Sequence, residues 1–242
     1  MTVETAAHID AVALESERFA RAARGPLDAR VPSCPDWALG DLVWHLASVQ
    51  WVWAEVVGKR ALEREPIGQP EDRPDEELVP WFDEVSDRLV SALRSTDPTV
   101  RVWSWADGQQ DVAWVARRQA HEAAVHRWDA QGALGTPEPI ASDLAADGMA
   151  EFFDWMLTSE DATGFDGVVR VRLTPTDHGE ARTVEVAEGR IDPSAEATPD
   201  VTVRGTASDL LLLLWRRVTA DSVAVEGDRA ALDRFLAVAD LT

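Results

Sequence analysis

The sequence predicts a four-helix bundle followed by a small α+β domain whose sheet is mainly antiparallel. Three observations lead to this fold class. Apolar residues recur at helical spacing through the first half, residues 132–139 hold two prolines and two glycines, and short runs of alternating apolar and polar residues follow. We therefore place a helical domain at residues 1–136 and an α+β domain at residues 137–242.

Four segments of the first domain carry the helical pattern, and each ends where the sequence disfavours a helix. Gly and Pro at 25–26 follow the first, Gly58 closes the second, and Thr-Asp-Pro at 96–98 follows the third. Residues 59–80 are rich in Glu, Asp and Pro, so we expect an exposed acidic connection there. The expected helices are 4–24, 37–57, 81–93 and 110–130.

The second domain mixes strand and helix signals. Val169, Val171 and Leu173 alternate with arginines, as in a half-buried strand. Thr206 and Asp228 each precede a helical run and are typical N-cap residues. The expected elements are a helix at 141–157, strands at 168–173, 182–187, 201–203 and 223–225, one helix containing 210–215 and one ending at 239.

Composition limits the classes of function. The chain holds 23 Lys and Arg against 44 Asp and Glu, a formal net charge of −21, which repels nucleic acids and anionic membranes. Cys34 is the only cysteine, which excludes intramolecular disulfides and cysteine-rich metal sites. The longest apolar run, 210–215, is far shorter than the roughly 20 residues of a membrane span, and residues 1–20 lack the order of a signal peptide. We expect a cytoplasmic protein.

Three residues on two predicted helices form a candidate metal site. Glu122 and His126 are four residues apart, so their side chains project from one helix face. His45 lies in the middle of the second predicted helix, beside its apolar stripe. Two imidazoles and one carboxylate would leave a divalent ion with an open coordination position, as in catalytic zinc sites. The zinc-protease motif is absent, because His121 and His126 are five residues apart.

The same residues have readings that involve no metal. A Glu and a His four apart also stabilise a helix as a simple pair. Asp41 stands four residues before His45, yet a carboxylate near a helix start is favoured by the helix dipole alone. Asp129 could support His126 from outside the coordination shell, although a solvated acid at a helix end is the more ordinary interpretation.

The remaining candidate residues give weaker signals. We expect His8 and His178 to be exposed and without a role, and Cys34 to be a small packed residue rather than a nucleophile, since Arg30 is its nearest basic neighbour. Six tryptophans at helical or near-helical spacing fit a core better than a pocket: Trp44, Trp51, Trp53, Trp103, Trp105 and Trp114. Two arginine pairs could hold a carboxylate substrate or pair with the many acids: Arg117 with Arg118, and Arg216 with Arg217.

Several segments resemble one known family along the whole chain. Residues 31–37 (VPSCPDW), 41–46 (DLVWHL) and 117–129 (RRQAHEAAVHRWD), with 200–205 and 225–228 near the end, are similar to the mycothiol-dependent maleylpyruvate isomerases of actinobacteria. The resemblance implies a DinB-like metal-binding bundle joined to a domain related to sterol carrier proteins. It also implies that the metal ligands are His45, Glu122 and His126, the same three residues that the spacing indicates.

The resemblance implies chemistry on a low-molecular-weight thiol. The cofactors would be a divalent metal ion, zinc above all, and mycothiol as cosubstrate; the catalytic residues would be His45, Glu122 and His126, acting through the metal. A thiol bound to such an ion loses its proton and becomes a nucleophile. It would add to a small electrophile, either for cis-trans isomerisation of a maleylpyruvate-type substrate, which the resemblance favours, or for S-transfer. Arg204, Arg216 and Arg217 are candidates for holding substrate carboxylates.

Two other functions stay open from the residues. In a metal-dependent hydrolase, a bound water would be the nucleophile and Asp41 or Asp129 the base. In a non-catalytic binding module, the α+β domain would hold an apolar ligand and the metal would be structural or absent. Neither the oligomeric state nor the residues that bind the thiol can be inferred from the sequence.

Overall fold

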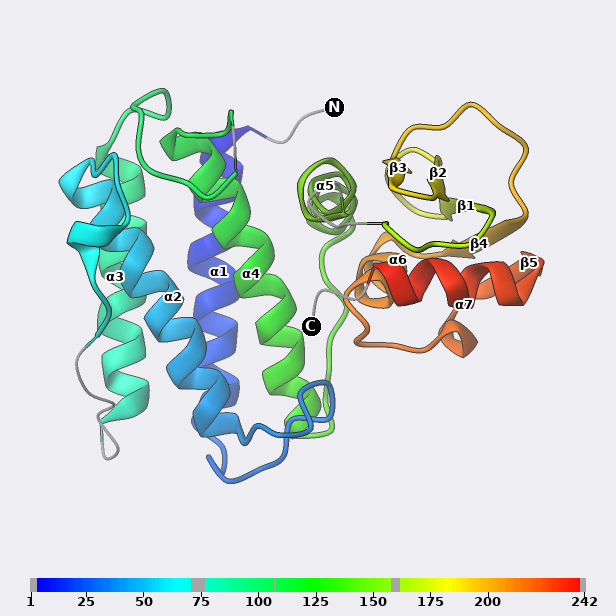
Figure 1. Ribbon diagram of the computed structural model, residues 1–242. Coiled ribbons are helices and arrows are strands. Elements are labelled where there is room, and N and C mark those ends of the chain that lie inside the picture. The colour runs from blue at the N-terminus through cyan, green and yellow to red at the C-terminus, as the bar shows by residue number, and fades with distance from the viewer. Residues whose placement is uncertain (1–3, 71–76, 107, 158–161, 240–242) are drawn as a thin grey trace. The chain divides into compact units, whose positions relative to one another are not determined.

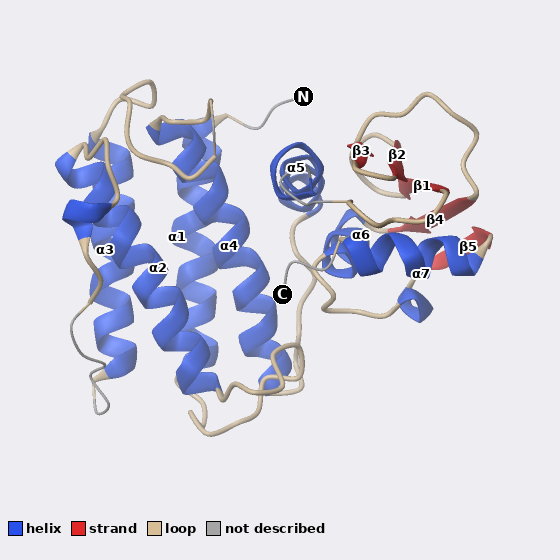
Figure 2. Ribbon diagram, viewed as in Figure 1, coloured by secondary structure: helices blue, strands red, loops and turns tan. Residues whose placement is uncertain are grey.

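The computed structural model describes residues 4–70, 77–106, 108–157 and 162–239. The chain divides into two compact units, Met1–Glu138 and Pro139–Thr242. The first is all-helical and the second combines helices with one sheet (Figure 2). The predicted fold class, a four-helix bundle followed by a small α+β domain, is therefore confirmed.

Four long helices form the first unit: α1 (Thr5–Ala23), α2 (Leu39–Lys59), α3 (Leu78–Ser95) and α4 (Val112–Ala133). Helix α1 packs mainly against α4 and α3, and α2 packs against α3 and α4, so α1 and α2 lie diagonally across the bundle (Figure 1). The apolar stripes meet in a core in which, for example, the rings of Phe19 and Phe82 lie 4.8 Å apart. The contact between α2 and α4 brings the candidate metal ligands together.

The ends of these helices differ slightly from the sequence expectation. Helix α2 continues through Gly58 and ends when Arg60 adopts a left-handed conformation, with φ of 51°. The connection expected at 59–80 contains a 3₁₀ turn, η1 (Glu65–Ile67), and Ile67 is buried, so this part is not wholly exposed. Residues 71–76 of that connection lie outside the described residues.

A buried ion pair joins α1 to α4. The Arg127 Nε atom donates to Glu15 Oε2 at 2.7 Å, and both side chains are almost fully buried. Arg127 Nη1 also donates to Gln131 Oε1 at 2.8 Å and to the backbone oxygen of Glu138. Removing one partner of such a pair leaves a buried charge without its counterion, which costs several kcal/mol.

The second unit begins with α5 (Ser142–Glu151) and a π-helical turn, η2 (Phe152–Met156). Its five strands are β1 (Val168–Pro175), β2 (Arg182–Ala187), β3 (Arg190–Asp192), β4 (Val201–Gly205) and β5 (Ala224–Gly227). They lie in the order β3-β2-β1-β4-β5, and only β1 and β4 are parallel. The sequence did not predict β3, which is three residues long and contains a single apolar residue.

Helices α6 (Ala207–Leu214) and α7 (Arg229–Val238), with a 3₁₀ turn η4 (Ala220–Ser222), complete the second unit. The predicted caps are confirmed: Thr206 accepts from Asp209 N, and Asp228 accepts from Ala230 N. One face of the sheet is apolar and buried, and its alternate residues include Val171, Val184 and Val203. In the described part of the chain, no helix is long and apolar enough to cross a membrane.

The buried pair gives a first prediction. Arg127→Met should lower the free energy of unfolding of the first unit by about 3 kcal/mol, because Glu15 then keeps only the partly exposed Arg18 as counterion. The double variant Glu15→Met, Arg127→Met should recover much of this loss, since no charge remains buried. Urea unfolding followed by tryptophan fluorescence measures both.

Arg21→Ala is the matched control. Arg21 forms an exposed ion pair with Glu17 on α1, the helix that also carries Glu15. Its effect should stay within about 0.5 kcal/mol. A loss below 1 kcal/mol for Arg127→Met, or a double variant as unstable as the single one, would contradict the assigned role.

Candidate metal centre

The structure brings His45, Glu122 and His126 together at the contact between α2 and α4. The Glu122 Oε1 atom lies 3.5 Å from His45 Nε2 and 3.3 Å from His126 Nε2. One donor atom from each residue lies within 4.8 Å of the others. Glu122 and His126 share a helix face as the four-residue spacing predicts, and α2 supplies His45 from the opposite side.

These separations fit a small divalent ion. Nitrogen and oxygen ligands lie about 2.0–2.2 Å from zinc, so two ligands of a tetrahedral site are about 3.4 Å apart. The two measured distances to Glu122 Oε1, 3.3 and 3.5 Å, agree with that value. The donor set of two imidazoles and a carboxylate also suits zinc and its neighbours in the first transition row.

The cluster is partly exposed to solvent. The side chain of His45 is 35% exposed and that of Glu122 19%, whereas that of His126 is 9% exposed. A three-ligand site that stays partly exposed is typical of catalytic zinc centres, in which a small molecule is the fourth ligand. The ring of Trp37 packs against His45, with centroids 4.9 Å apart, and limits the positions open to the imidazole.

Asp129 supports His126 from the far side of the ring. Its Oδ2 atom lies 2.9 Å from His126 Nδ1, and its Oδ1 atom accepts a hydrogen bond of 2.6 Å from Ser33 Oγ. A carboxylate only accepts, so Nδ1 carries the proton and Nε2 faces Glu122. Asp129 is fully buried, so its more ordinary interpretation as a solvated acid at a helix end is wrong.

Charge in the cluster is balanced by Arg118. Its guanidinium, which is almost buried, donates to Glu122 Oε2 at 2.5 Å. Burial opposes ionisation of Glu122, but the Arg118 charge and the hydrogen bonds from His126 and His45 hold the pKa of Glu122 well below its ordinary value. Glu122 is therefore a carboxylate at neutral pH, as a metal ligand must be.

His126 shows the opposite shift. Burial of the ring opposes its charge, but hydrogen bonds to Asp129 and Glu122, with the charges of both carboxylates, raise the pKa of His126 from 6.5 to about 9. In the metal-free protein at neutral pH, His126 is therefore an imidazolium held between two carboxylates. A metal ion that binds at Nε2 must displace one proton.

The segment before α2 supplies two residues that sequence reasoning gave no role. Ser33 holds Asp129, and Trp37 covers His45. Both lie within residues 31–37, one of the segments that carry the family resemblance. That resemblance was the sequence signal that could have identified them. Cys34, between them, is partly buried against the bundle core, in agreement with its interpretation as a packed residue.

The other sequence candidates lie away from the cluster or have structural contacts. Asp41 Oδ2 accepts from the backbone nitrogen of Ala38 and so caps α2, the role that a carboxylate at a helix start predicts. The expectation that His8 is exposed is wrong: it is 4% exposed, because it lies on the core-facing stripe of α1 with Val12 and Phe19. Its ring meets that of His121 edge to face at 6.0 Å. His178 is exposed, as expected.

Several tryptophans form a cluster of stacked and edge-to-face rings at one end of the bundle. Trp53 packs against Trp103 and Trp114, and Trp105 packs against Trp114. Trp53 and Trp114 are buried, whereas Trp105 is 45% exposed. Trp44, Trp51 and Trp103 are half-buried, so the expected core role is confirmed for Trp53 and Trp114. Trp44 packs elsewhere, stacked on Trp81 with centroids 5.1 Å apart.

Of the arginine candidates, Arg118 serves the cluster, and three others belong to the second unit. Arg204 lies 3.7 Å from Glu226 on the sheet. Arg216 adopts a left-handed conformation after α6, and Arg217 donates to the backbone oxygen of Trp215 at 2.8 Å. Their role in holding substrate carboxylates stays a prediction.

Comparison with known families gives two matches. Residues 10–131 match the mycothiol maleylpyruvate isomerase N-terminal domain, and residues 143–234 match the C-terminal domain of the same proteins. A search among curated proteins finds no match.

Solved structures show the same two-part fold. A crystal structure of a mycothiol-dependent maleylpyruvate isomerase is similar with a TM-score of 0.65 and 15% identity, covering 93% of this chain and 96% of that one. A histidine-to-alanine mutant of such an enzyme gives a TM-score of 0.63 and 14% identity over the same shares. At 14–15% identity, these structures support the fold alone. The two domain matches identify the family. The chain belongs to the mycothiol-dependent maleylpyruvate isomerase family.

Proposed function

We propose that the protein is a divalent-metal enzyme that uses mycothiol to act on a small electrophile, with maleylpyruvate-type cis-trans isomerisation as its reaction. The metal ligands are His45, Glu122 and His126. The observation that carries the proposal is the pair of distances from Glu122 Oε1 to the two imidazole nitrogens, 3.3 and 3.5 Å, which suit one tetrahedral ion. Membership of the family supports the thiol and the type of substrate.

The residues of the cluster have separate tasks in this proposal. A bound divalent ion such as zinc would lower the pKa of a thiol at its open position and so supply a thiolate near neutral pH. Arg118 keeps Glu122 ionised, and Asp129 directs the Nε2 atom of His126 toward the ion. Trp37 fixes the ring of His45 on the exposed side of the cluster.

The isomerisation needs no strong acid or base from the chain. A mycothiol thiolate would add to the conjugated double bond, rotation would follow about the resulting single bond, and elimination would break the C–S bond and restore both the double bond and the thiolate. The hydrolase alternative requires a carboxylate base beside a bound water. Asp129 already accepts from Ser33 and His126, and Asp41 caps α2, so both candidate bases have other partners. This favours the thiol reaction, with S-transfer to the electrophile as its close alternative.

Metal content tests the ligand set. We expect about one divalent ion per chain in the purified protein after incubation with zinc, and almost none in His45→Ala or Glu122→Ala, because each variant removes one of three ligands. Mass spectrometry with plasma ionisation measures the ratio. His178→Ala, which changes an exposed histidine of the second unit, should keep the metal. Full metal content in both ligand variants would refute the assignment.

The pH dependence of metal binding follows from His126. Because the pKa of His126 is about 9 in the metal-free protein, binding below that pH displaces one proton. The apparent affinity should therefore rise about tenfold per pH unit from pH 6.5 to 8.5 and level off above about 9. Competition with a metal indicator at each pH gives the slope. In Asp129→Asn, the pH above which the apparent affinity stops rising should be lower. An unchanged profile would contradict the assigned role of Asp129.

The stability of the metal-free protein should decrease as the pH rises. A raised pKa means that the charged His126 contributes stability that is fully present below about pH 6.5 and is lost as the pH rises through about 9. The melting temperature of the protein kept in chelator should therefore fall over this interval. The fall should be smaller in Asp129→Asn, and an equal fall in both proteins would count against this explanation.

Turnover tests the reaction itself. With maleylpyruvate as substrate, we expect isomerisation only when both mycothiol and metal are present, and a loss of at least 100-fold in kcat/KM in His45→Ala. His178→Ala should be unchanged. Formation of a stable thioether would favour S-transfer, whereas turnover without thiol would overturn the proposal and favour the hydrolase.

A further inference from the structure

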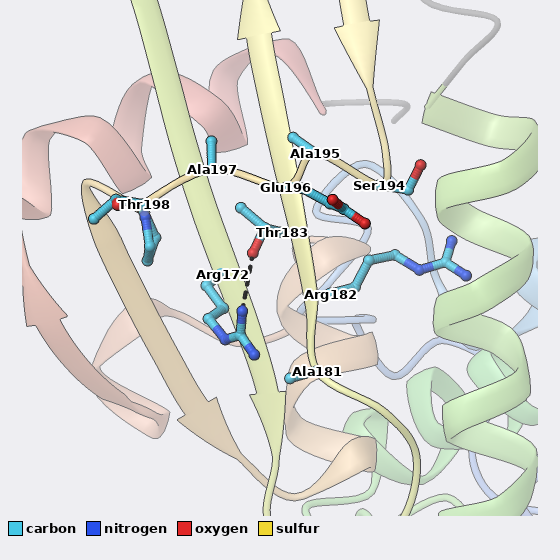
Figure 3. A pocket seen from close by; sticks show the side chains of 10 residues that line it. Arg172, Ala181, Arg182, Thr183, Ser194, Ala195, Glu196, Ala197 and Thr198 are labelled. Atoms are coloured by element: carbon cyan, nitrogen blue, oxygen red, sulfur yellow. Dashed lines mark hydrogen bonds between the residues drawn. The ribbon is translucent and has the colours of Figure 1, made fainter.

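The outer face of the sheet in the second unit carries an open groove of about 630 Å³. The groove lies between strands β1 and β2 and the segment 193–199, named here the strap, which joins β3 to β4. Figure 3 shows Arg172 on the floor of the groove with Thr183, and Ser194 and Glu196 on the strap. The groove belongs wholly to the second unit and uses none of the candidate metal ligands.

The strap is fixed at both ends, so the groove is built into the fold. Ala195 N donates to the backbone oxygen of Thr183 at 3.0 Å, and Asp200 N donates to the backbone oxygen of Arg170 at 2.9 Å. Asp200 Oδ2 also accepts from Arg170 N at 2.7 Å. The strap is thereby held across β2 and β1. Apart from Glu196, the side chains that it gives to the groove are small: Ser194, Ala195, Ala197, Thr198 and Pro199.

Arg172 differs from the other arginines of this face. The register of the sheet places Arg170, Arg172, Arg190 and Arg204 on one side. Arg170 and Arg190 both pair with Glu185, and Arg204 lies near Glu226. Within the described residues, Arg172 has no carboxylate partner, and its one hydrogen bond runs from Nη1 to Thr183 Oγ1 at 3.3 Å.

The groove therefore presents a guanidinium whose other N–H donors face open space. A guanidinium has five N–H donors in a plane, and two of them can donate parallel hydrogen bonds to the two oxygens of a carboxylate. Thr183 Oγ1 accepts from Arg172, so its own proton can point to a ligand. Arg182, at the edge of the groove, pairs with Asp154 at 2.5 Å. Figure 3 shows its guanidinium turned away from Arg172.

We propose that this groove binds a small organic carboxylate, held by Arg172 with the hydroxyl of Thr183. A monoanion matches the single positive charge of Arg172 better than a phosphate dianion does, since Glu196 lines the same groove and the chain carries a net charge of −21. Glu196 weakens the site by like-charge repulsion. This ligand site is additional to the metal centre and does not depend on the proposed reaction.

Titration of the full-length, nitrogen-15-labelled protein tests the site by NMR. Butyrate, a monoanion at neutral pH, should produce saturable shifts in the Arg172 Nε–H signal and in the amides of Thr183 and Ala195. The same titration in His45→Ala should give the same affinity, because the metal centre is not involved. Inorganic phosphate should bind more weakly than butyrate, and tighter binding of phosphate would overturn the choice of a carboxylate.

Three variants make the assignment sharper. Arg172→Met should weaken butyrate binding at least tenfold, and Glu196→Gln should strengthen it severalfold, because it removes the repelling charge. Arg190→Met is the matched control, since Arg190 lies on the same face but is paired with Glu185, and it should change the affinity less than twofold. An equal effect of Arg172→Met and Arg190→Met, or shifts spread over all four arginines of the face, would refute the proposal.

Discussion

The carboxylate of Glu122 is the group on which the candidate centre depends. One of its oxygens lies near two imidazoles and the other accepts from a guanidinium. A carboxylate in such a partly closed place is stable only when opposite charge compensates for lost hydration. Arg118 and the protonated His126 provide that compensation in the metal-free protein, and a divalent ion can replace the proton without leaving Glu122 uncompensated.

The sequence predicted most of the architecture because each element has a strong local signal. Helical periodicity located the four long helices, and Thr206 and Asp228 cap the helices that they were expected to cap. Strand β3 was missed because three residues with one apolar side chain show no alternation; its signal was the Gly189 turn directly after β2, where φ is 59°. The structure thus differs from the expectation where the pattern is short.

The candidate site was only partly predictable, because spacing describes one helix at a time. The placement of Glu122 and His126 on one face follows from four-residue spacing, but their contact with His45 depends on how α2 packs on α4. The burial of Asp129 and its bond to Ser33 join distant parts of the chain, so the sequence alone favoured the wrong interpretation. His8 was misjudged because it was assigned to the exposed face of the first helix, whereas it is buried beside Val12.

The Ser33–Asp129 hydrogen bond also has a consequence for the order of folding. It joins residues 96 positions apart, and the contact can form only after the chain has closed a long loop and α2 has docked against α4. Formation of helix α4 alone brings Glu122 and His126 together, because they are one turn apart. Asp129 lies three residues after His126 on the same helix, so their hydrogen bond can also form early. The Ser33 donor that fixes the Asp129 carboxylate is completed late, and a collapsed intermediate with native helices would hold that carboxylate without its anchor.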